Sequence, residues 1–504
     1  MVMLKAKQET ANLLNRAGTD KMQTMSTGST TQLGEYGPKW TRIFLLALLV
    51  GIALIVGLAV SISPQKLVYV VALAAIPLAF KWPVETALGS VGLLLQFDAI
   101  LGAVKSDSGT TTYTWFVAVG AGALLLVRIV NGRRQAPPRA AIFWVLLIVW
   151  ATTTILWAMD STAGIKLLPT AWALLIFYLV AVSSRVSKKQ LYVVIILTAL
   201  GGCAAASWAS WGYFHGTTWR DVSGRASLVL DDKAADPNYF AAMLLVPLSL
   251  GVGVYLSTRS RLLKSIMAVS VALTALSIFL SMSRGALVAL SLMFGVYVYR
   301  LGVKLRTLAG LAVILVLLAG VAPDTFWTRL KPDSVRTGAG RTEVWAAASQ
   351  MLKHHYLAGV GLSNFKIAYN SYAGAAPHFV GYFKDSHNTY LNVLAEQGVL
   401  GLFFFVLALT YQFLPMRSNS VSVRAPIPLA VSCEAALVAM LGAAFFIDFL
   451  WTKAFWFTLI LCTFVSRVDL SEEASPVKRS VASGELQTAD AVFRTPYSPL
   501  HWNR

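Results

Sequence analysis

Long apolar runs separated by short polar segments fill most of the chain from residue 43 onward. A helix needs roughly 20 apolar residues to cross about 30 Å of hydrocarbon, so each run predicts a membrane span. We expect an all-α polytopic integral membrane protein with about 12–14 transmembrane helices. The candidate spans lie near 43–62, 67–81, 86–104, 113–128, 141–159, 167–183, 191–211, 238–256, 265–281, 284–299, 307–322, 388–413, 427–447 and 452–466.

The composition excludes a water-soluble enzyme. Of the 504 residues, 57% are hydrophobic and 13% are charged, against roughly half and roughly a quarter in soluble domains. The net charge of +19 would fit a nucleic-acid-binding protein, but cytoplasmic loops of membrane proteins are also rich in Lys and Arg. We therefore expect a lipid bilayer around the protein and no nucleic-acid partner.

The placement of the basic residues predicts the orientation of the spans. If the amino terminus is cytoplasmic, the longer inner loops carry Lys and Arg and contain no Asp or Glu, as the positive-inside rule requires. The basic residues of these loops are Arg128, Arg133, Arg134, Arg139, Arg185, Lys188, Lys189, Arg259, Arg261, Lys264, Arg300, Lys304, Arg306, Arg417 and Arg424. Five of the six histidines then lie on the outer side, where we expect the function to reside.

This topology divides the chain into five parts. Residues 1–42 form a polar tail without a cleavable signal peptide, which we expect to be cytoplasmic and disordered. Residues 43–322 hold transmembrane helices with an outer loop at 212–237, and residues 323–386 form a large extracytoplasmic loop. Residues 387–466 hold the carboxy-terminal transmembrane helices, and 467–504 form a second cytoplasmic tail.

Three arginines stand near the predicted outer boundary of the membrane. Arg284 begins an apolar run, where a charge is costly unless it snorkels to lipid headgroups or has a functional partner. Arg225 has small neighbours and no adjacent acid, so we expect its guanidinium to be free. Arg220 is the weakest candidate because it can pair with Asp221 on the surface.

A fourth arginine, Arg341, opens a predicted amphipathic helix over 341–353. Apolar residues recur there at helical spacing and predict a helix that lies on the outer membrane surface. Those residues are Val344, Trp345, Ala348, Met351 and Leu352. Because a cation at a helix start opposes the helix dipole, Arg341 suggests a compensating anion.

His387 stands where the last outer segment meets the span near 388–413. An imidazole can take a proton from a hydroxyl near neutral pH, although a capping or headgroup-facing histidine would also fit this position. On a continuous helix, Glu396 would lie about 180° around and roughly 13 Å deeper. We therefore interpret Glu396 as a buried helix partner, with Asn392 as a candidate bonding partner.

We expect no metal and no cofactor. The pair His354-His355 has no carboxylate at ligand spacing, and the three cysteines lie in apolar runs without metal-ligand spacing. The chain also lacks a phosphate-binding loop of the G-x-x-x-x-G-K-[ST] type. The substrate must therefore arrive activated. Arginines and a histidine suit a diphosphate donor and a hydroxyl acceptor, since guanidinium groups bind phosphate oxygens and neutralise a departing diphosphate.

Several segments resemble the O-antigen ligase and Wzy polymerase superfamily. They are 281–287, Arg341-x-x-x-Trp345 through Gly359-Val360-Gly361, and above all His387-Asn388-x-Tyr390-Leu391 with Glu396-x-Gly398-x-x-Gly401. Arg225 with Asp236-Pro237-Asn238 is similar to the preceding outer loop of that superfamily. The resemblance covers roughly residues 205–410, and it departs from the common pattern at 354–358, where a proline is often found.

The resemblance implies a metal-independent, inverting membrane glycosyltransferase with an undecaprenyl-diphosphate-linked glycan as donor. It implies that Arg225, Arg284 and Arg341, with Arg220 as a weaker candidate, bind the diphosphate. It also implies that His387 activates the acceptor hydroxyl, which can belong to a glycan, to lipid A core or to a protein. We expect Asn388, Glu396 and Trp345 to give structural support, and the site to face the outside of a bacterial cytoplasmic (inner) membrane.

Two alternatives stay open at this point. Asp98 and Glu434 lie inside predicted spans and favour a lipid-linked oligosaccharide flippase or another transporter, because transporters place charges near the membrane midplane. Within the glycosyltransferase interpretation, a ligase that builds lipopolysaccharide and a polysaccharide polymerase share the donor and differ in the acceptor. The sequence does not choose between them.

Overall fold

The computed structural model describes residues 77–106, 109–218, 224–230, 233–302, 327, 340–421 and 428–468. All of them belong to one compact unit of the chain, Val71–Arg504. The spans predicted near 43–62 and 307–322, and most of the one near 67–81, lie outside the described residues.

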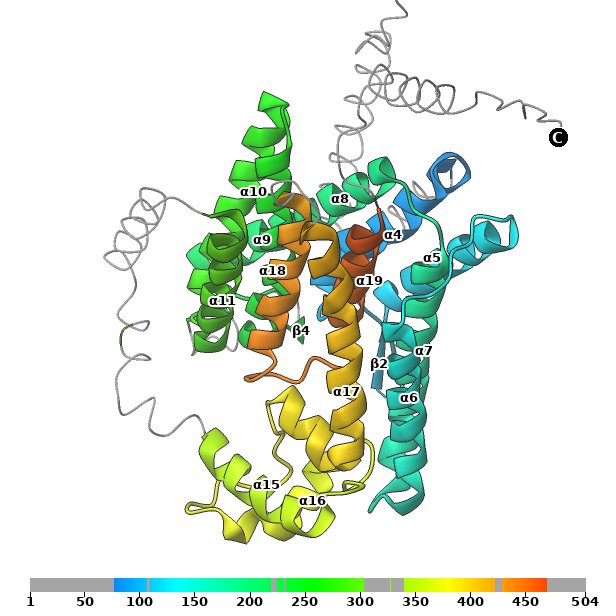
Figure 1. The fold of residues 1–504 in the computed structure, drawn as a ribbon. Helices are drawn as coiled ribbons and strands as arrows, with labels where there is room; N and C mark the ends of the chain where they lie inside the picture. Colours follow the sequence, from blue (N-terminus) through cyan, green and yellow to red (C-terminus); the bar gives the residue numbers. More distant parts are fainter. Residues whose placement is uncertain are drawn as a thin grey trace, which may run out of the picture. The chain divides into compact units, whose positions relative to one another are not determined.

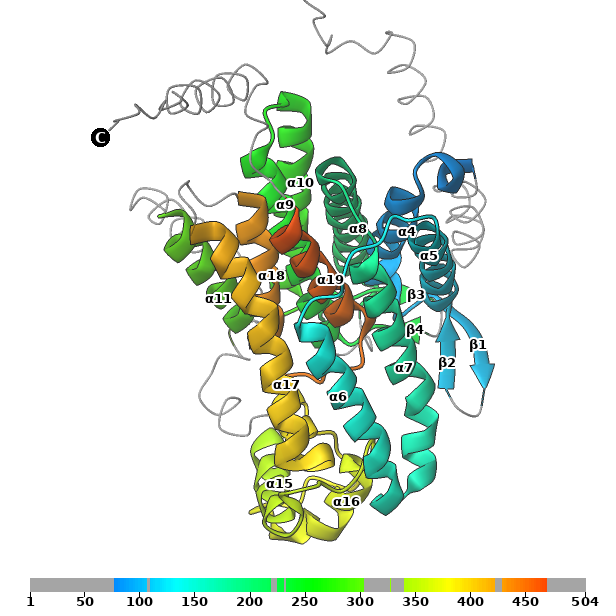
Figure 2. The same ribbon diagram turned by 45° about the vertical axis from the view of Figure 1, so that its right-hand side comes forward.

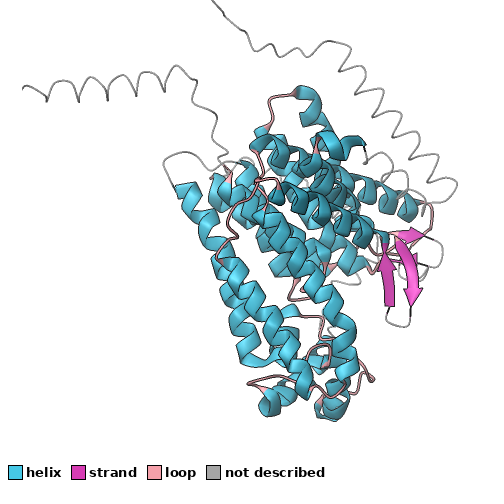
Figure 3. Cartoon of the chain, turned by 90° about the vertical axis from the view of Figure 1, so that its right-hand side faces the viewer, coloured by secondary structure: helices cyan, strands magenta, loops and turns pink. Residues whose placement is uncertain are grey.

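Helices make up nearly all of the described structure (Figures 1 and 3). Eight of the described helices are long and apolar enough to cross a membrane, which confirms an all-α, polytopic membrane protein. The helices are α4 (Pro83–Leu94), α5 (Tyr113–Val130), α6 (Ala140–Thr153), α7 (Ser161–Ser183), α8 (Lys188–Phe214), α9 (Pro237–Ser257), α10 (Arg261–Leu280), α11 (Arg284–Leu301), α15 (Arg341–His355), α16 (Phe365–Tyr372), α17 (Thr389–Val421), α18 (Pro428–Ala443) and α19 (Lys453–Arg467).

The span predicted near 86–104 is wrong. Helix α4 ends at Leu94, a 3-10 turn follows at Leu95–Phe97, and the chain then forms a short antiparallel sheet of β1 (Gly102–Ser106) and β2 (Gly109–Thr112) (Figure 2). The carboxylate of Asp98, directly after the 3-10 turn, accepts a bond from Lys453 Nζ at 2.7 Å. A second small sheet pairs β3 (Val229–Leu230) with β4 (Lys233–Ala234).

Close packing of small residues holds α9 at the centre of the bundle, against α18. Ser249 Oγ on α9 donates to the Ser432 carbonyl on α18 at 2.7 Å, and a Cβ added at Gly253 would lie 2.3 Å from Ser432 Oγ. Small side chains let membrane helices approach closely and bond to one another. The bundle is therefore held by van der Waals contact and interhelical hydrogen bonds.

Helix α17 reverses direction at Gly398 and is not the continuous span that we expected near 388–413. Gly398 has φ 68° and ψ −171°, which breaks the helix. Residues 389–397 fold back beside the following part, since the rings of Tyr390 and Phe405 lie 6.1 Å apart, whereas 15 residues of straight helix span about 22 Å. Because of the reversal, Glu396 lies at the end of the folded-back part, away from the membrane-spanning part of α17. The prediction that Glu396 lies deeper in the membrane than His387 is therefore wrong.

The reversal is fixed by the Gly359-Val360-Gly361 segment. Backbone N–H groups of Val360 and Gly361 donate to the carbonyls of Ala395 and Glu396, both at 2.9 Å. Val399 N returns a bond to the Tyr356 carbonyl at 2.8 Å. The two backbones approach too closely for a side chain at position 359, since a Cβ at Gly359 would lie 2.3 Å from the Glu396 carbonyl carbon.

Replacing Gly398 by alanine is expected to destabilise the protein by about 3 kcal/mol or more, because this φ/ψ region is almost closed to other residues. The new Cβ would also lie 2.0 Å from the Leu357 carbonyl oxygen. Thermal unfolding in detergent measures the effect. Gly120→Ala on α5 is the matched control, since nothing lies within 4 Å of its added Cβ. Equal melting temperatures for the two variants would contradict the prediction.

Candidate active site

Residues 340–388 form a lobe, the α15–α16 lobe, beyond the ends of α6, α7 and α17 (Figures 1 and 2). Its core comprises one face of α15, with Val344, Ala347 and Met351 buried, packed against Phe365 and Tyr369 of α16. The helix predicted over 341–353 is therefore α15, and its apolar stripe packs within the lobe.

Side-chain bonds attach the lobe to the bundle and hold the last residues of the lobe in place. Asn364 is fully buried and forms a two-way link with the backbone of Asp160 before α7, accepting at 2.7 Å and donating at 2.9 Å. Trp345 Nε1 on α15 donates to the Ser386 carbonyl at 2.9 Å. The Asn364 link attaches the lobe to α7, and the Trp345 bond fixes the chain immediately before His387.

Glu396 and Asn388 both support backbone segments near His387. The Glu396 carboxylate accepts a bond from Phe365 N at the start of α16, at 3.1 Å. This bond takes the place of the one suggested with Asn392, whose amide oxygen instead accepts from Ser386 Oγ at 3.3 Å. Asn388 caps α17 by accepting from Leu391 N at 3.0 Å.

Arg284 and Arg341 each occupy the first residue of a helix, α11 and α15 respectively. Burial lowers the pKa of Arg341, the nearby charge of Arg284 lowers it further, and Asp236 opposes the change. The Arg341 guanidinium also lies 5.9 Å from the ring centre of Phe446. Two mutually repelling guanidinium groups at two positive helix ends form a place where an anion is strongly favoured.

Arg225 is buried and engaged, contrary to the expectation that its guanidinium is free. Its side chain is 4% exposed. Nε donates to the Ser281 carbonyl at 2.7 Å, and a terminal nitrogen donates to Asn238 Oδ1 at 2.8 Å. Arg225 therefore ties the α10–α11 turn, which precedes Arg284, to the start of α9.

His387 lies between the lobe and α17 in a left-handed backbone conformation, with φ 45°. Desolvation lowers the pKa of its imidazole below the ordinary value of 6.5, and Arg341 and Lys366 contribute in the same direction. Asp385 and Asp236 oppose this shift. The ring is therefore mostly neutral at pH 7 and can accept a proton.

Sequence reasoning missed the segment 444–449, between α18 and α19, which contacts the helix starts that carry the candidate site residues. Thr389 N donates to the Ala444 carbonyl at 2.8 Å, and Phe449 N donates to Thr389 Oγ1 at 2.9 Å. Phe446 packs against Gly285 beside Arg284, where an added Cβ would lie 2.8 Å from Phe446 Cβ. The segment joins the starts of α11, α15 and α17, and no local sequence signal marks it.

The same segment contains a buried carboxyl group, Asp448. Its Oδ1 is buried without a hydrogen-bond partner among the described residues. Desolvation is the main reason that its pKa is raised to about 6. Its backbone carbonyl accepts from the hydroxyl of Tyr239 on α9 at 3.0 Å.

Asp448→Asn is expected to stabilise the protein by up to about 3 kcal/mol above pH 6, since it removes a buried charge. The folded state binds more protons than the unfolded state between the ordinary pKa near 3.8 and the raised pKa near 6. Wild-type stability therefore falls as pH rises through this window. Melting temperatures of both proteins from pH 4 to 8 test the prediction, and an unchanged pH profile in the variant would contradict it.

The other residues singled out in the sequence, Arg220 and the pair His354-His355, are not placed beside Arg284, Arg341 and His387 by any described contact. Arg220 lies outside the described residues. His354 and His355 lie near the ring of Tyr372, with centroids 6.0 and 6.5 Å away. Within the described part of the chain, no group of three or more His, Cys, Asp or Glu side chains is arranged to hold a metal ion.

The fold and the site together define a multi-pass membrane protein with a cationic cluster and a neutral histidine at one end. Residues 269–406 match the protein-family model described as O-antigen ligase. This segment contains Arg284, Arg341 and His387, and the match confirms the resemblance to the O-antigen ligase and Wzy polymerase superfamily. It supports a function of the ligase or polymerase type, and hence a glycosyltransferase-like enzyme acting on lipid-linked glycans. No curated protein matches the chain.

Proposed function

We propose that this protein transfers a glycan from an undecaprenyl-diphosphate donor to an acceptor hydroxyl at the outer face of a bacterial cytoplasmic membrane. The observation that carries the proposal is the pair Arg284 and Arg341, which stand at two helix N-termini close enough to depress the Arg341 pKa. His387 is close enough to Arg341 for that charge to lower its own pKa.

In this proposal Arg284 and Arg341 bind the donor diphosphate. Guanidinium groups donate paired hydrogen bonds to phosphate oxygens, and the helix ends add further positive potential. As the bond between the sugar and the diphosphate breaks, negative charge grows on the leaving oxygen, and these fixed cations stabilise it. We assign Arg225 to the same cluster, where its bonds to Ser281 and Asn238 hold the turn that precedes Arg284. Arg220 remains a weaker candidate for this cluster.

His387 accepts the proton of the acceptor hydroxyl. The hydroxyl oxygen then forms the new bond to the anomeric carbon while the diphosphate leaves with the electrons of the old bond. In a single displacement the attacking oxygen approaches from the side opposite to the leaving group, which inverts the configuration. Because arginines supply the positive charge at the diphosphate, the proposed reaction needs no metal.

The α15–α16 lobe covers the donor in this proposal. The Asn364–Asp160 link attaches it to the bundle, and the Trp345–Ser386 bond holds its last residues against α15. Exclusion of water would protect the activated sugar from hydrolysis. The acceptor can be a glycan, lipid A core or a protein hydroxyl, so the distinction between a ligase and a polymerase is left to experiment.

The experiment mixes the purified full-length protein with an undecaprenyl-diphosphate-linked glycan and candidate acceptors. Free undecaprenyl diphosphate and a glycosylated acceptor, appearing in equal amounts without added metal and in the presence of a chelator, are the expected result. In a deletion strain, glycan shortened to one repeat identifies a polymerase, and unattached full-length polymer identifies a ligase. Movement of the intact donor across vesicles without release of the diphosphate would overturn the proposal in favour of a flippase.

The two acidic residues that favoured a transporter are both held in ion pairs. Asp98 bonds Lys453 at 2.7 Å, and Glu434 pairs with Arg300 at 3.3 Å, with both side chains largely buried. Each pair neutralises charge within the helix bundle. These contacts give Asp98 and Glu434 a structural role, and they leave the cationic end of the bundle as the better-supported site.

A further inference from the structure

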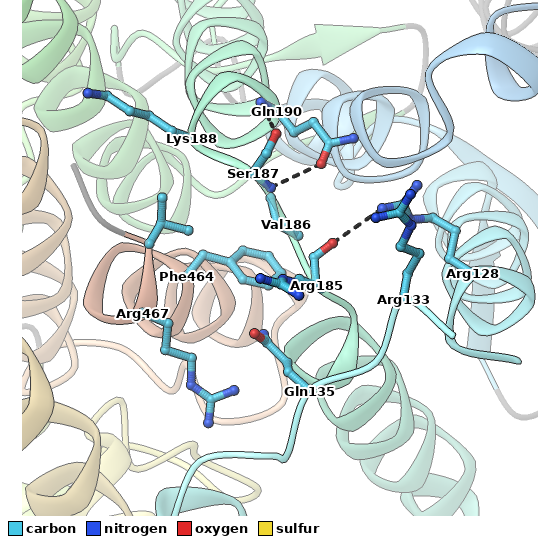
Figure 4. Close-up of a pocket in the computed structure, with 11 residues that line it drawn as sticks. Arg128, Arg133, Gln135, Arg185, Val186, Ser187, Lys188, Gln190, Phe464 and Arg467 are labelled. Atoms are coloured by element: carbon cyan, nitrogen blue, oxygen red, sulfur yellow. Dashed lines mark hydrogen bonds between the residues drawn. The ribbon is translucent and has the colours of Figure 1, made fainter. Parts of the chain in front are cut away.

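A basic pocket of about 580 Å³ lies at the other end of α7 from the α15–α16 lobe (Figure 4). Helix α7 starts beside Asn364 of the lobe and ends at Ser183. A helix of its 23 residues is about 35 Å long, close to the thickness of a membrane. In the proposed topology this pocket opens on the cytoplasmic side, so it is separate from the glycan site.

Five cations from four segments line the pocket, and none of its described lining residues is acidic. They come from the end of α5, the loop after it, the α7–α8 connection with the start of α8, and the end of α19. They are Arg128, Arg133, Arg185, Lys188 and Arg467. Loop charges that serve only to orient a membrane protein have no need to converge on one cavity.

Hydrogen bonds to backbone carbonyls, donated by two arginine side chains and one backbone N–H, hold these segments together. Arg128 donates to the Arg185 carbonyl at 3.2 Å, and Arg185 N donates to the Arg133 carbonyl at 2.9 Å. On the other side of the pocket, Arg467 donates to the carbonyls of Ala136 and Val182, at 2.8 and 3.2 Å. The geometry is therefore built into the fold, and like charges are kept close at an electrostatic cost that a bound anion would remove.

One polar group in this pocket is left without a partner. Arg128 Nε is buried and makes no hydrogen bond among the described residues. The nearby carboxylate of Glu85 on α4 is within bonding distance of Gln190 Nε2, at 3.4 Å. The pocket thus combines excess positive charge with an unused donor.

Apolar side chains form part of the pocket wall and also lie near it on α5. Phe464 and Val186 form part of its wall. On α5, one turn or less from Arg128, Leu126, Val127 and Val130 are 51%, 58% and 78% exposed. Because these apolar side chains are exposed on a helix long enough to span a membrane, we infer that they contact lipid tails. We propose that the pocket binds the phosphate of an anionic phospholipid headgroup, with the acyl chains lying along α5.

The test uses the full-length protein in a neutral detergent and follows its melting temperature as phosphatidylglycerol is added. We expect phosphatidylglycerol to raise the melting temperature and phosphatidylcholine to have little effect. The combined variant Arg133→Gln, Arg185→Gln, Lys188→Gln removes three exposed cations. Each cation near a membrane surface strengthens the binding of an anionic lipid about fivefold. The phosphatidylglycerol concentration that gives half of the rise in melting temperature should therefore increase about 100-fold in this variant. In the single variant Arg133→Gln, which removes only one cation, this lipid concentration should increase about fivefold.

The matched control carries Arg259→Gln, Arg261→Gln and Lys264→Gln, the same loss of charge in the α9–α10 loop and the first turn of α10, and should respond as the wild type does. An equal response from the pocket variant and the wild type would overturn the proposal. An equal response to phosphatidylcholine would do so too. Inorganic diphosphate serves as the soluble probe, and a shift as large as that from the lipid, at the same concentration, would overturn the assignment to a headgroup in favour of a soluble phosphate ligand.

Discussion

His387→Ala is expected to lower glycan transfer by about 10²- to 10⁴-fold, the usual contribution of a positioned general base. Neighbouring groups partly desolvate the imidazole, but the residue is exposed at the junction of the lobe and α17, so its removal leaves no cavity in the core. We expect normal amounts of folded protein and normal donor binding. Release of undecaprenyl diphosphate by the purified variant measures the effect.

The pH profile separates a base from a structural histidine. Because desolvation, with Arg341 and Lys366, lowers the His387 pKa below 6.5, the neutral form dominates above that pH. The transfer rate should therefore rise with pH through a value below 6.5 and stay level near pH 7 to 8. His354→Ala, an exposed histidine on α15, should retain full activity. Wild-type activity of His387→Ala would refute the assignment.

Arg284→Lys is expected to lower transfer by about 10²-fold, although the charge is kept. A lysine is a point charge with a different reach and cannot make the paired hydrogen bonds of a guanidinium. Loss of one donor to a developing anion typically costs 10²- to 10³-fold in rate. The rate of diphosphate release, measured with saturating donor, tests this prediction.

Arg261→Lys is the matched control because Arg261 is also the first residue of a helix, α10, and is exposed. It should leave transfer unchanged. If Arg284→Lys also retains full activity, Arg284 serves only to anchor the helix at lipid headgroups. A double variant with Arg341→Lys should then be active as well, whereas our proposal expects it to be inactive.

The proposed site could be predicted in part because some signals are local. Arg284 at the start of an apolar run and Arg341 at the start of an amphipathic helix both stand out from their neighbours in sequence. The motif His387-Asn388-x-Tyr390-Leu391 is also a local pattern, at the start of an apolar run. What brings these residues together is not local, since Arg284 and Arg341 approach each other across Phe446, a hydrophobic residue without any distinguishing pattern.

Partners of buried polar groups were the hardest features to predict. Arg225 has no acid next to it in sequence, and yet its guanidinium bonds a carbonyl 56 residues away. Glu396 bonds the backbone of Phe365, 31 residues away, in place of Asn392 on its own helix turn. Such bonds depend on which backbone groups the fold leaves unpaired, and a burial pattern does not contain that information.

Apolar periodicity and the distribution of charge determined the class of this protein, because hydrocarbon forces backbone groups to pair within helices. The reversal at Gly398 was decided by tertiary structure. An isolated glycine in an apolar helix equally fits close helix packing, and only the contact with Gly359 and Leu357 selects the turn. The same holds for the basic pocket. The sequence shows its arginines as loop charges, and only the fold brings four segments together around one cavity.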